Sequence, residues 1–284
     1  MVVFSSQVNQ WLNFLANTTA LVKVTAFFLA WGILWLPLLI PVAISIKWRP
    51  PQPLTEKQKL LLVASLYLIA PLIVIASSWV EGSSFPEYGL SWQGNLFTSL
   101  GLGFFLGTFS LVVTFIGEWI FGLLQWHWEN LKRLPPLLLP LLLIGLWIGI
   151  TEELIFRGFI INGLQQDYDL TYAAVISSLI FALLHLVWEQ KYTLPQLPGL
   201  WLMGLVLVLS RWADNGNLGI AWGLHASWIW GLSCLDSAEL ITYTGKGGQW
   251  LTGIGNKPLA GVAGILCLLI VGFCLFFYHR YSFI

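Results

Sequence analysis

Long apolar runs separated by short polar breaks extend from residue 24 to residue 278. An α-helix needs about 20 apolar residues to cross the hydrocarbon core of a bilayer, and most of these runs are close to that length. Several breaks contain proline or charged residues, which end a membrane helix. The pattern therefore predicts eight helical spans, at residues 24–46, 60–80, 96–121, 137–163, 171–188, 197–213, 218–235 and 259–278.

Two further segments have the pattern of structure at the membrane surface. In residues 5–22, one helical face carries Val8, Trp11, Leu12 and Leu15, which is typical of a helix that lies in the membrane interface. The alternative is that this segment simply extends the first span. Residues 126–133 combine tryptophans with basic residues, as expected of an amphipathic connector. We expect three parts: an interfacial N-terminal helix (1–23), spans one to three with the connector (24–135), and a core of spans four to eight (136–284).

The composition places the chain in the membrane. Hydrophobic residues make up 57% of it, charged residues 9%, and the mean hydropathy is +0.79. These values predict an all-α, polytopic helical bundle that is integral to a lipid bilayer. The net charge is +0, and the sequence has neither a basic cluster nor a Gly-rich phosphate loop, so we expect no nucleic-acid partner.

The distribution of Lys and Arg predicts the orientation. Counted by loop, nine of these residues fall on one side of the eight predicted spans and four on the other. Loops rich in Lys and Arg favour the cytoplasmic side. We therefore expect both termini on the outer side.

Five ionisable residues lie well inside the predicted spans: Glu152, Glu153, Arg157, His185 and His225. An acidic residue at the centre of a membrane helix costs roughly 2.5–3.5 kcal/mol, so such residues face protein or water and commonly mark a working site. Glu153 and Arg157 are four residues apart and can pair on one helical face. Glu152 points elsewhere and is free to face a cavity. A single buried histidine is more simply a structural hydrogen-bonding residue, but two of them with an unpaired glutamate favour a site.

These residues carry a family resemblance. Glu152-Glu153-x-x-x-Arg157, then Phe181-x-x-x-His185, then His225 resemble the three motifs of the CAAX-processing and bacteriocin-processing (CPBP) intramembrane glutamic endopeptidases, which include the type II CAAX prenyl endopeptidases. The resemblance implies an eight-helix protease that uses no metal or cofactor and cleaves a membrane-associated peptide or protein. It also implies that Glu152 is the general base for a water that His185 helps to hold. His225 would contribute to the oxyanion hole, with Glu153, Arg157 and Phe181 in supporting roles.

One position departs from the family pattern. Many members have Asn or another polar residue four positions after the last histidine, whereas this chain has Ile229. Losing one oxyanion-hole donor typically lowers the rate by about 10²- to 10³-fold. Trp222 lies three residues before His225 on the same helical face, so its indole N–H is a candidate replacement. The hydroxyl of Ser227 is a second candidate.

Three alternatives remain at this stage. Glu152, His185 and His225 could instead be three ligands of a catalytic zinc ion, with water as the fourth. The chain could be a non-catalytic membrane scaffold, immunity or assembly factor of the same fold, which the departure at Ile229 favours. A proton-coupled transporter also suits buried Glu and His, although the two halves of the sequence show no repeat.

Overall fold

The computed structural model describes residue 10 and residues 13–15, 17–50, 52, 54–187 and 190–281. In that part of the chain, seven helices are long and apolar enough to cross a membrane. The first four are α2 (Ala20–Ser45), α3 (Glu56–Glu81), α4 (Gly94–Ile120) and the continuous helix of α5 (Pro135–Glu153), η2 (Leu154–Ile160) and α6 (Ile161–Leu164). The fifth is α7 (Leu170–Leu184) with the turn η3 (His185–Val187), and the sixth is α9 (Leu197–Ala213) with the turns α8 (Gln190–Thr193) and η4 (Leu194–Gln196) before it. The last is α12 (Val262–Tyr281). The predicted all-α bundle is confirmed, and the protein is an integral multi-pass membrane protein.

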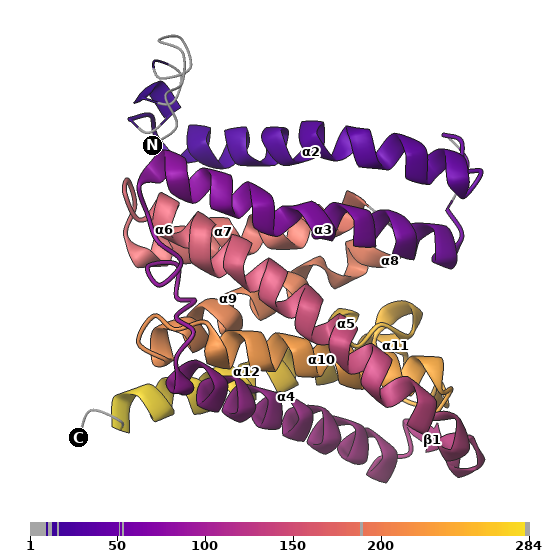
Figure 1. Cartoon of the computed structure of the whole chain (residues 1–284). Helices are drawn as coiled ribbons and strands as arrows, with labels where there is room; N and C mark the ends of the chain where they lie inside the picture. Colours follow the sequence, from indigo (N-terminus) through magenta and orange to yellow (C-terminus); the bar gives the residue numbers. More distant parts are fainter. Residues whose placement is uncertain are drawn as a thin grey trace.

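The remaining predicted span is α10 (Gly219–Ser237), which polar residues make less apolar than the others. It begins beside the loop that follows α3, where the amide of Leu218 donates to the carbonyl of Gly89 at 2.9 Å. It ends next to β2 (Ile241–Tyr243), at the opposite end of the bundle (Figure 1). α10 therefore makes an eighth crossing, and the start of α2 and the end of α12 lie at the same end of the bundle.

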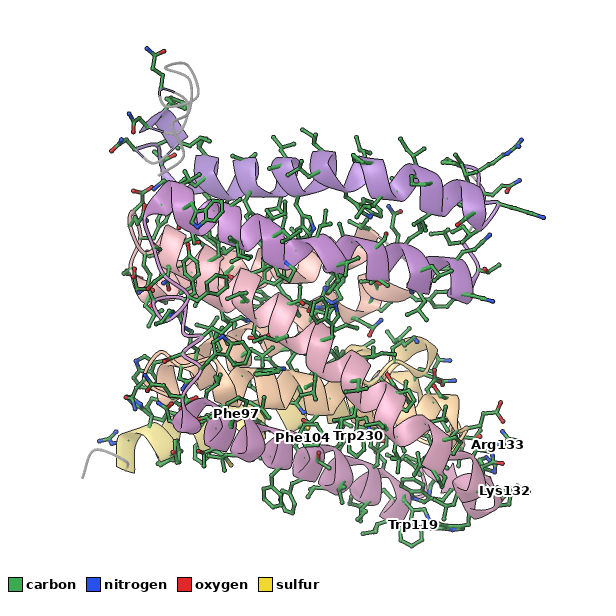
Figure 2. All side chains as sticks on the ribbon, in the orientation of Figure 1. Phe97, Phe104, Trp119, Lys132, Arg133 and Trp230 are labelled. Carbon is green, nitrogen blue, oxygen red and sulfur yellow. The ribbon has the colours of Figure 1, made fainter. Side chains whose placement is uncertain are left out.

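α10 packs along α4 through small residues. A Cβ atom on Gly103 of α4 would lie 2.2 Å from the carbonyl oxygen of Ile220, and a Cβ atom on Gly223 would lie 2.2 Å from that of Leu100. The two backbones can approach this closely only because neither position has a side chain. Farther along, the rings of Phe104 and Trp230 pack with their centroids 5.4 Å apart (Figure 2).

The connector predicted for residues 126–133 differs from the expectation. Its first residue ends a short strand, β1 (Leu124–Trp126), and the rest forms a 3₁₀ helix, η1 (Trp128–Arg133). β1 pairs antiparallel with β2, with Leu124 opposite Tyr243. The basic end of η1 projects beyond Trp119 at this end of the bundle (Figure 2). The alternation of apolar and polar residues that identifies a strand needs at least four residues, so strands of three residues could not be recognised in the sequence.

The loop that follows β2 carries three short helical turns. They are α11 (Gln249–Thr252), η5 (Ile254–Asn256) and η6 (Pro258–Ala260). Three more turns lie between α7 and α9, namely η3 (His185–Val187), α8 (Gln190–Thr193) and η4 (Leu194–Gln196). With η3, the fifth span runs from Leu170 to Val187, close to the predicted 171–188. Both sets of turns lie at the end of the bundle that holds β1 and β2 (Figure 1).

α2 and α3 form a hairpin that lies against the turn after α5. The indole of Trp31 donates to the carbonyl of Leu66 at 3.1 Å, and the ring of Phe27 lies 4.5 Å from that of Phe159. Most of the interfacial helix predicted for residues 1–23 lies outside the described residues, and Ala20–Lys23 belong to α2. The boundary proposed at residue 135 stays a prediction.

Candidate active site

The two adjacent glutamates lie where α5 changes its geometry. Glu152 and Glu153 are the last residues of α5, and the next seven residues form the π-helical segment η2. A π-helical turn leaves backbone carbonyls without their usual partners, and such turns are frequent at functional sites. Here the hydroxyl of Ser177 donates to the carbonyl of Phe156 at 2.9 Å, and the guanidinium of Arg211 donates to the carbonyl of Arg157. Neighbouring helices thus hold the widened turn in place.

Glu153 forms the ion pair that the spacing predicts. Its Oε1 lies 3.0 Å from Nη1 of Arg157, and both side chains are fully buried. The guanidinium also donates to the carbonyl of Gly204 at 3.2 Å and lies 4.5 Å from the centre of the Phe181 ring. A buried charge needs a partner of opposite sign and hydrogen bonds of good geometry, and these contacts provide both for Arg157.

Glu152 has one oxygen that accepts a hydrogen bond from the protein and one buried oxygen that accepts none from the described residues. Oε1 accepts a hydrogen bond from the hydroxyl of Tyr67 on α3. Oε2 lies 3.5 Å from Nε2 of His225 and has no hydrogen-bond partner among the described residues. A carboxylate oxygen in this situation is free to accept a proton or a hydrogen bond from a small molecule.

The two predicted histidines are each fixed through Nδ1. In His225, Nδ1 lies 2.7 Å from Oε1 of Glu153. In His185, which directly follows α7, Nδ1 lies 2.8 Å from the carbonyl oxygen of Phe181. A carbonyl oxygen only accepts hydrogen bonds, so Nδ1 of His185 carries the hydrogen and Nε2 is left for other partners. The Phe181 ring packs edge-to-face against both imidazoles, with centroid distances of 4.7 Å to His185 and 5.9 Å to His225.

These groups face a single space, which we call the central cavity. It has a volume of about 420 Å³, and Glu152, His185 and His225 all line it, together with Tyr67. Ile229 also lines it, one helical turn after His225. The three predicted catalytic residues therefore lie around one cavity, with an apolar side chain at the position where many CPBP members have a polar one.

The prediction that the indole N–H of Trp222 replaces the missing oxyanion donor is wrong. Its indole N–H donates to the carbonyl of Leu146 at 2.8 Å, which ties α10 to α5, and Trp222 is not among the residues that line the central cavity. The second candidate fails for a similar reason, since the hydroxyl of Ser227 donates to the carbonyl of Leu224 at 2.9 Å. Both donors serve the packing of α10, so neither is directed at a substrate.

Sequence reasoning missed two residues that support the site. Tyr67 holds Glu152, but in the sequence it is a lone tyrosine in an apolar run, and nothing local indicates its partner. Arg211 donates to Asn162 Oδ1 at 2.9 Å and to the backbone of the π-helical segment. Its place near the end of an apolar run was the only available signal.

The zinc alternative needs three protein ligands that converge on one point. Among the described residues, no three side chains of His, Cys, Asp or Glu are arranged to hold a metal ion. The arrangement therefore does not favour the zinc alternative over the metal-independent one.

Comparison with known proteins agrees with these motifs. Residues 134–231 match the family described as Type II CAAX prenyl endopeptidase Rce1-like. The CPBP resemblance is confirmed. The matched CPBP segment runs from the start of α5 into α10 and contains Glu152, His185 and His225.

A curated relative matches a similar length of chain. The chain is 33% identical over 89 residues to an Escherichia coli protein described as "Uncharacterized 24.3 kDa protein", which is 31% of this chain and 40% of that relative. No solved structure gives a significant match. The chain thus shares with this relative less than half of the relative's length.

Proposed function

We propose that the protein is an intramembrane endopeptidase that hydrolyses a peptide bond of a membrane-associated substrate, with Glu152 as general base. The observation that carries the proposal is that Glu152, His185 and His225 line one cavity, and that Oε2 of Glu152 accepts no hydrogen bond from the described residues. The match to a prenyl endopeptidase family over residues 134–231 supports the same reaction class.

In the proposed reaction, Glu152 and His185 position one water in the central cavity. Oε2 of Glu152 takes a proton from the water as its oxygen bonds to the carbonyl carbon of the peptide, and the carbonyl electron pair moves onto oxygen. Glu152 then gives this proton to the amide nitrogen as the C–N bond breaks. The products are a carboxylic acid and an amine.

His225 supports the oxyanion in this proposal. The bond from Nδ1 to Glu153 fixes the ring so that Nε2 is directed toward Glu152 and the cavity. When Nε2 carries a hydrogen, it can donate to the developing negative charge, and a donor that is already in position contributes strongly to catalysis. Glu153 and Arg157 act as positioning residues because they hold the ring through buried contacts.

The test is cleavage by the purified protein in lipid nanodiscs. A pool of membrane-tethered peptides serves as substrate, and mass spectrometry identifies the products. Glu152→Gln and His185→Gln should each cleave about 10²- to 10⁴-fold more slowly than the unchanged protein, with the same helical content and elution volume. His279→Gln, on α12 and away from the cavity, is the matched control and should retain activity. Cleavage by Glu152→Gln at the unchanged rate would refute the mechanism.

One observation favours a non-catalytic scaffold as a second candidate. Ile229 lines the cavity, and the polar groups of Trp222 and Ser227 are engaged elsewhere. A scaffold needs the bundle and not the chemistry of Glu152. If this candidate is right, a cell that carries Glu152→Gln behaves like one with the unchanged protein, and the purified protein cleaves no peptide in the pool.

A further inference from the structure

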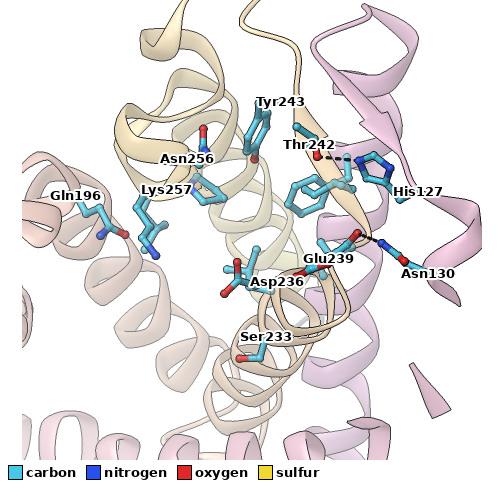
Figure 3. Close-up of a pocket in the computed structure, with 16 residues that line it drawn as sticks. His127, Asn130, Gln196, Ser233, Asp236, Glu239, Thr242, Tyr243, Asn256 and Lys257 are labelled. Atoms are coloured by element: carbon cyan, nitrogen blue, oxygen red, sulfur yellow. Dashed lines mark hydrogen bonds between the residues drawn. The ribbon is translucent and has the colours of Figure 1, made fainter. Parts of the chain in front are cut away.

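A second space, which we call the outer pocket, adjoins the central cavity at the end of the bundle that holds β1 and β2. It has a volume of about 660 Å³, and many of the side chains that line it are polar (Figure 3). In this view Thr242 and Tyr243 form one wall, and Gln196 and Lys257 form the other. Both spaces share part of their lining, namely Phe115, Gln196, Leu232, Pro258 and Leu259. The two spaces therefore meet at these residues.

A carboxylate without a full set of hydrogen bonds lies close to the residues that the two spaces share. Glu118 of α4 lines the central cavity three residues after Phe115, which lines both spaces. Only 5% of Glu118 is exposed, and its Oε2 has no hydrogen-bond partner among the described residues. A buried carboxylate oxygen without a partner is costly, so such a group needs an explanation.

A second unsatisfied group lies near it. The hydroxyl of Tyr243, on the wall of the outer pocket, is also buried without a partner among the described residues. The backbone brings this residue close to Glu118, because the amide of Leu123 donates to the carbonyl of Glu118 at 2.8 Å and the amide of Thr244 donates to the carbonyl of Leu123 at 2.9 Å. Burial and, next in size, the charge of Glu118 raise the pKa of Tyr243 well above its usual value. The boundary between the two spaces thus offers two oxygen acceptors to a single ligand.

The charged residues that line the two spaces indicate which sign of charge the ligand has. Four carboxylates and two lysines line the two spaces together: Glu118, Glu152, Asp236, Glu239, Lys59 and Lys257. Glu239 already pairs with Arg133 of η1. Carboxylates still exceed lysines after this pair is removed, so the joined spaces favour a cation over an anion.

We propose that Glu118, with Tyr243, binds a lysine or arginine side chain of the peptide substrate at the boundary between the central cavity and the outer pocket. An ammonium or guanidinium group has several N–H donors, so one side chain can donate to both oxygens. The site would select substrates with a basic residue at a fixed distance from the scissile bond. This inference rests on the proposed endopeptidase function, because it assumes that a peptide occupies the central cavity.

The test measures binding and not cleavage. Glu152→Gln in lipid nanodiscs is titrated with pairs of fluorescent peptides, each an apolar segment joined to a neutral polar tail. The two members of a pair differ only in carrying lysine or norleucine at one tail position, and this position is moved along the series. At one position the lysine peptide should bind roughly tenfold or more tightly than the norleucine peptide. Adding Glu118→Gln should remove this preference, and the affinity for the norleucine peptide should stay the same.

Two further variants make the result specific. Glu81→Gln changes a half-buried glutamate that also has a buried oxygen without a hydrogen-bond partner among the described residues. It lies at the far end of α3 and lines neither space, so this variant should still bind the lysine peptide more tightly than the norleucine peptide. Tyr243→Phe should reduce the preference several-fold, and it tests the site through a second residue if Glu118→Gln does not fold.

Two outcomes overturn the inference. One is equal binding of the lysine and norleucine peptides at every position, and the other is a preference that persists in both Glu118→Gln and Tyr243→Phe. Failure of the proposed function gives a different result, since the unchanged protein would then cleave no peptide while the lysine preference of Glu152→Gln stayed measurable.

Discussion

His225 bonds to Glu153, the glutamate that is already paired with Arg157, and only approaches Glu152. Its Nδ1 lies 2.7 Å from Oε1 of Glu153, whereas its Nε2 lies 3.5 Å from Oε2 of Glu152. The two adjacent glutamates therefore have separate roles. Glu153 joins an arginine and a histidine in a buried cluster, whereas Glu152 lines the central cavity and has one oxygen without a hydrogen-bond partner among the described residues.

This separation predicts that Glu→Gln substitutions at the two adjacent positions differ strongly in their effect on stability. Glu153→Gln removes the one charge that balances Arg157 by direct contact among the described residues, and breaking a buried ion pair in this way costs about 3–5 kcal/mol. Glu152→Gln keeps an oxygen that accepts from Tyr67, so it should unfold at nearly the same temperature as the unchanged protein. Thermal unfolding in detergent, followed by circular dichroism, measures both.

A double substitution checks the reason for this loss. Glu153→Gln combined with Arg157→Met removes both charges and should regain much of the lost stability, because no unpaired charge then remains. Equal stability of Glu152→Gln and Glu153→Gln would show that the ion pair does not stabilise the fold.

The local parts of this arrangement are predictable from the sequence, because helical spacing fixes them. Residues four apart lie on one face of a helix, which is why the pairing of Glu153 with Arg157 and the contact of Phe181 with His185 follow from the motifs. The lengths of the apolar runs predict the positions of the spans equally well. α9 begins and ends at the predicted residues, and α3 and α4 differ from the prediction by a few residues at most.

The contacts between distant segments are not predictable in this way. Tyr67 meets Glu152 only because of the way α3 lies against α5, and the indole of Trp222 turns away from the cavity because a carbonyl of α5 lies within reach. The strands β1 and β2 lie more than 100 residues apart in sequence and depend on the ends of α4 and α10 meeting. Helix periodicity contains no information on such pairings.

Tyr67→Phe should lower kcat about tenfold with little change in KM. The phenol hydroxyl is the only described group that donates to Oε1 of Glu152, and a hydrogen bond to a charged group contributes about 1.5–3 kcal/mol. Without it, the carboxylate loses its fixed orientation toward the water. Tyr172→Phe, on the exposed face of α7, is the control and should behave like the unchanged protein. The role assigned to Tyr67 is wrong if both variants have the same kcat.

The packing of α4 on α10 predicts a contrast between two glycines of one helix. Gly103→Ala would place a Cβ atom 2.2 Å from the carbonyl oxygen of Ile220, whereas a Cβ atom on Gly101 meets nothing within 4 Å. Overpacking of this kind typically costs about 1–3 kcal/mol, so Gly103→Ala should unfold at a clearly lower temperature. Gly101→Ala should be neutral or slightly more stable, since alanine favours a helix by about 1 kcal/mol over glycine. Similar unfolding temperatures for the two variants would contradict the close contact.

Ile229→Asn tests whether the cavity lacks an oxyanion donor. Ile229 lines the central cavity one turn after His225, and a carboxamide there would face the same space as Glu152. Because one oxyanion donor is typically worth about 10²- to 10³-fold in kcat, even an imperfectly placed amide should raise kcat by roughly tenfold. Ile229→Leu keeps the position apolar and should leave kcat unchanged. An Ile229→Asn protein that folds normally and cleaves no faster than Ile229→Leu would mean that the oxyanion is already fully supported by other groups, His225 among them.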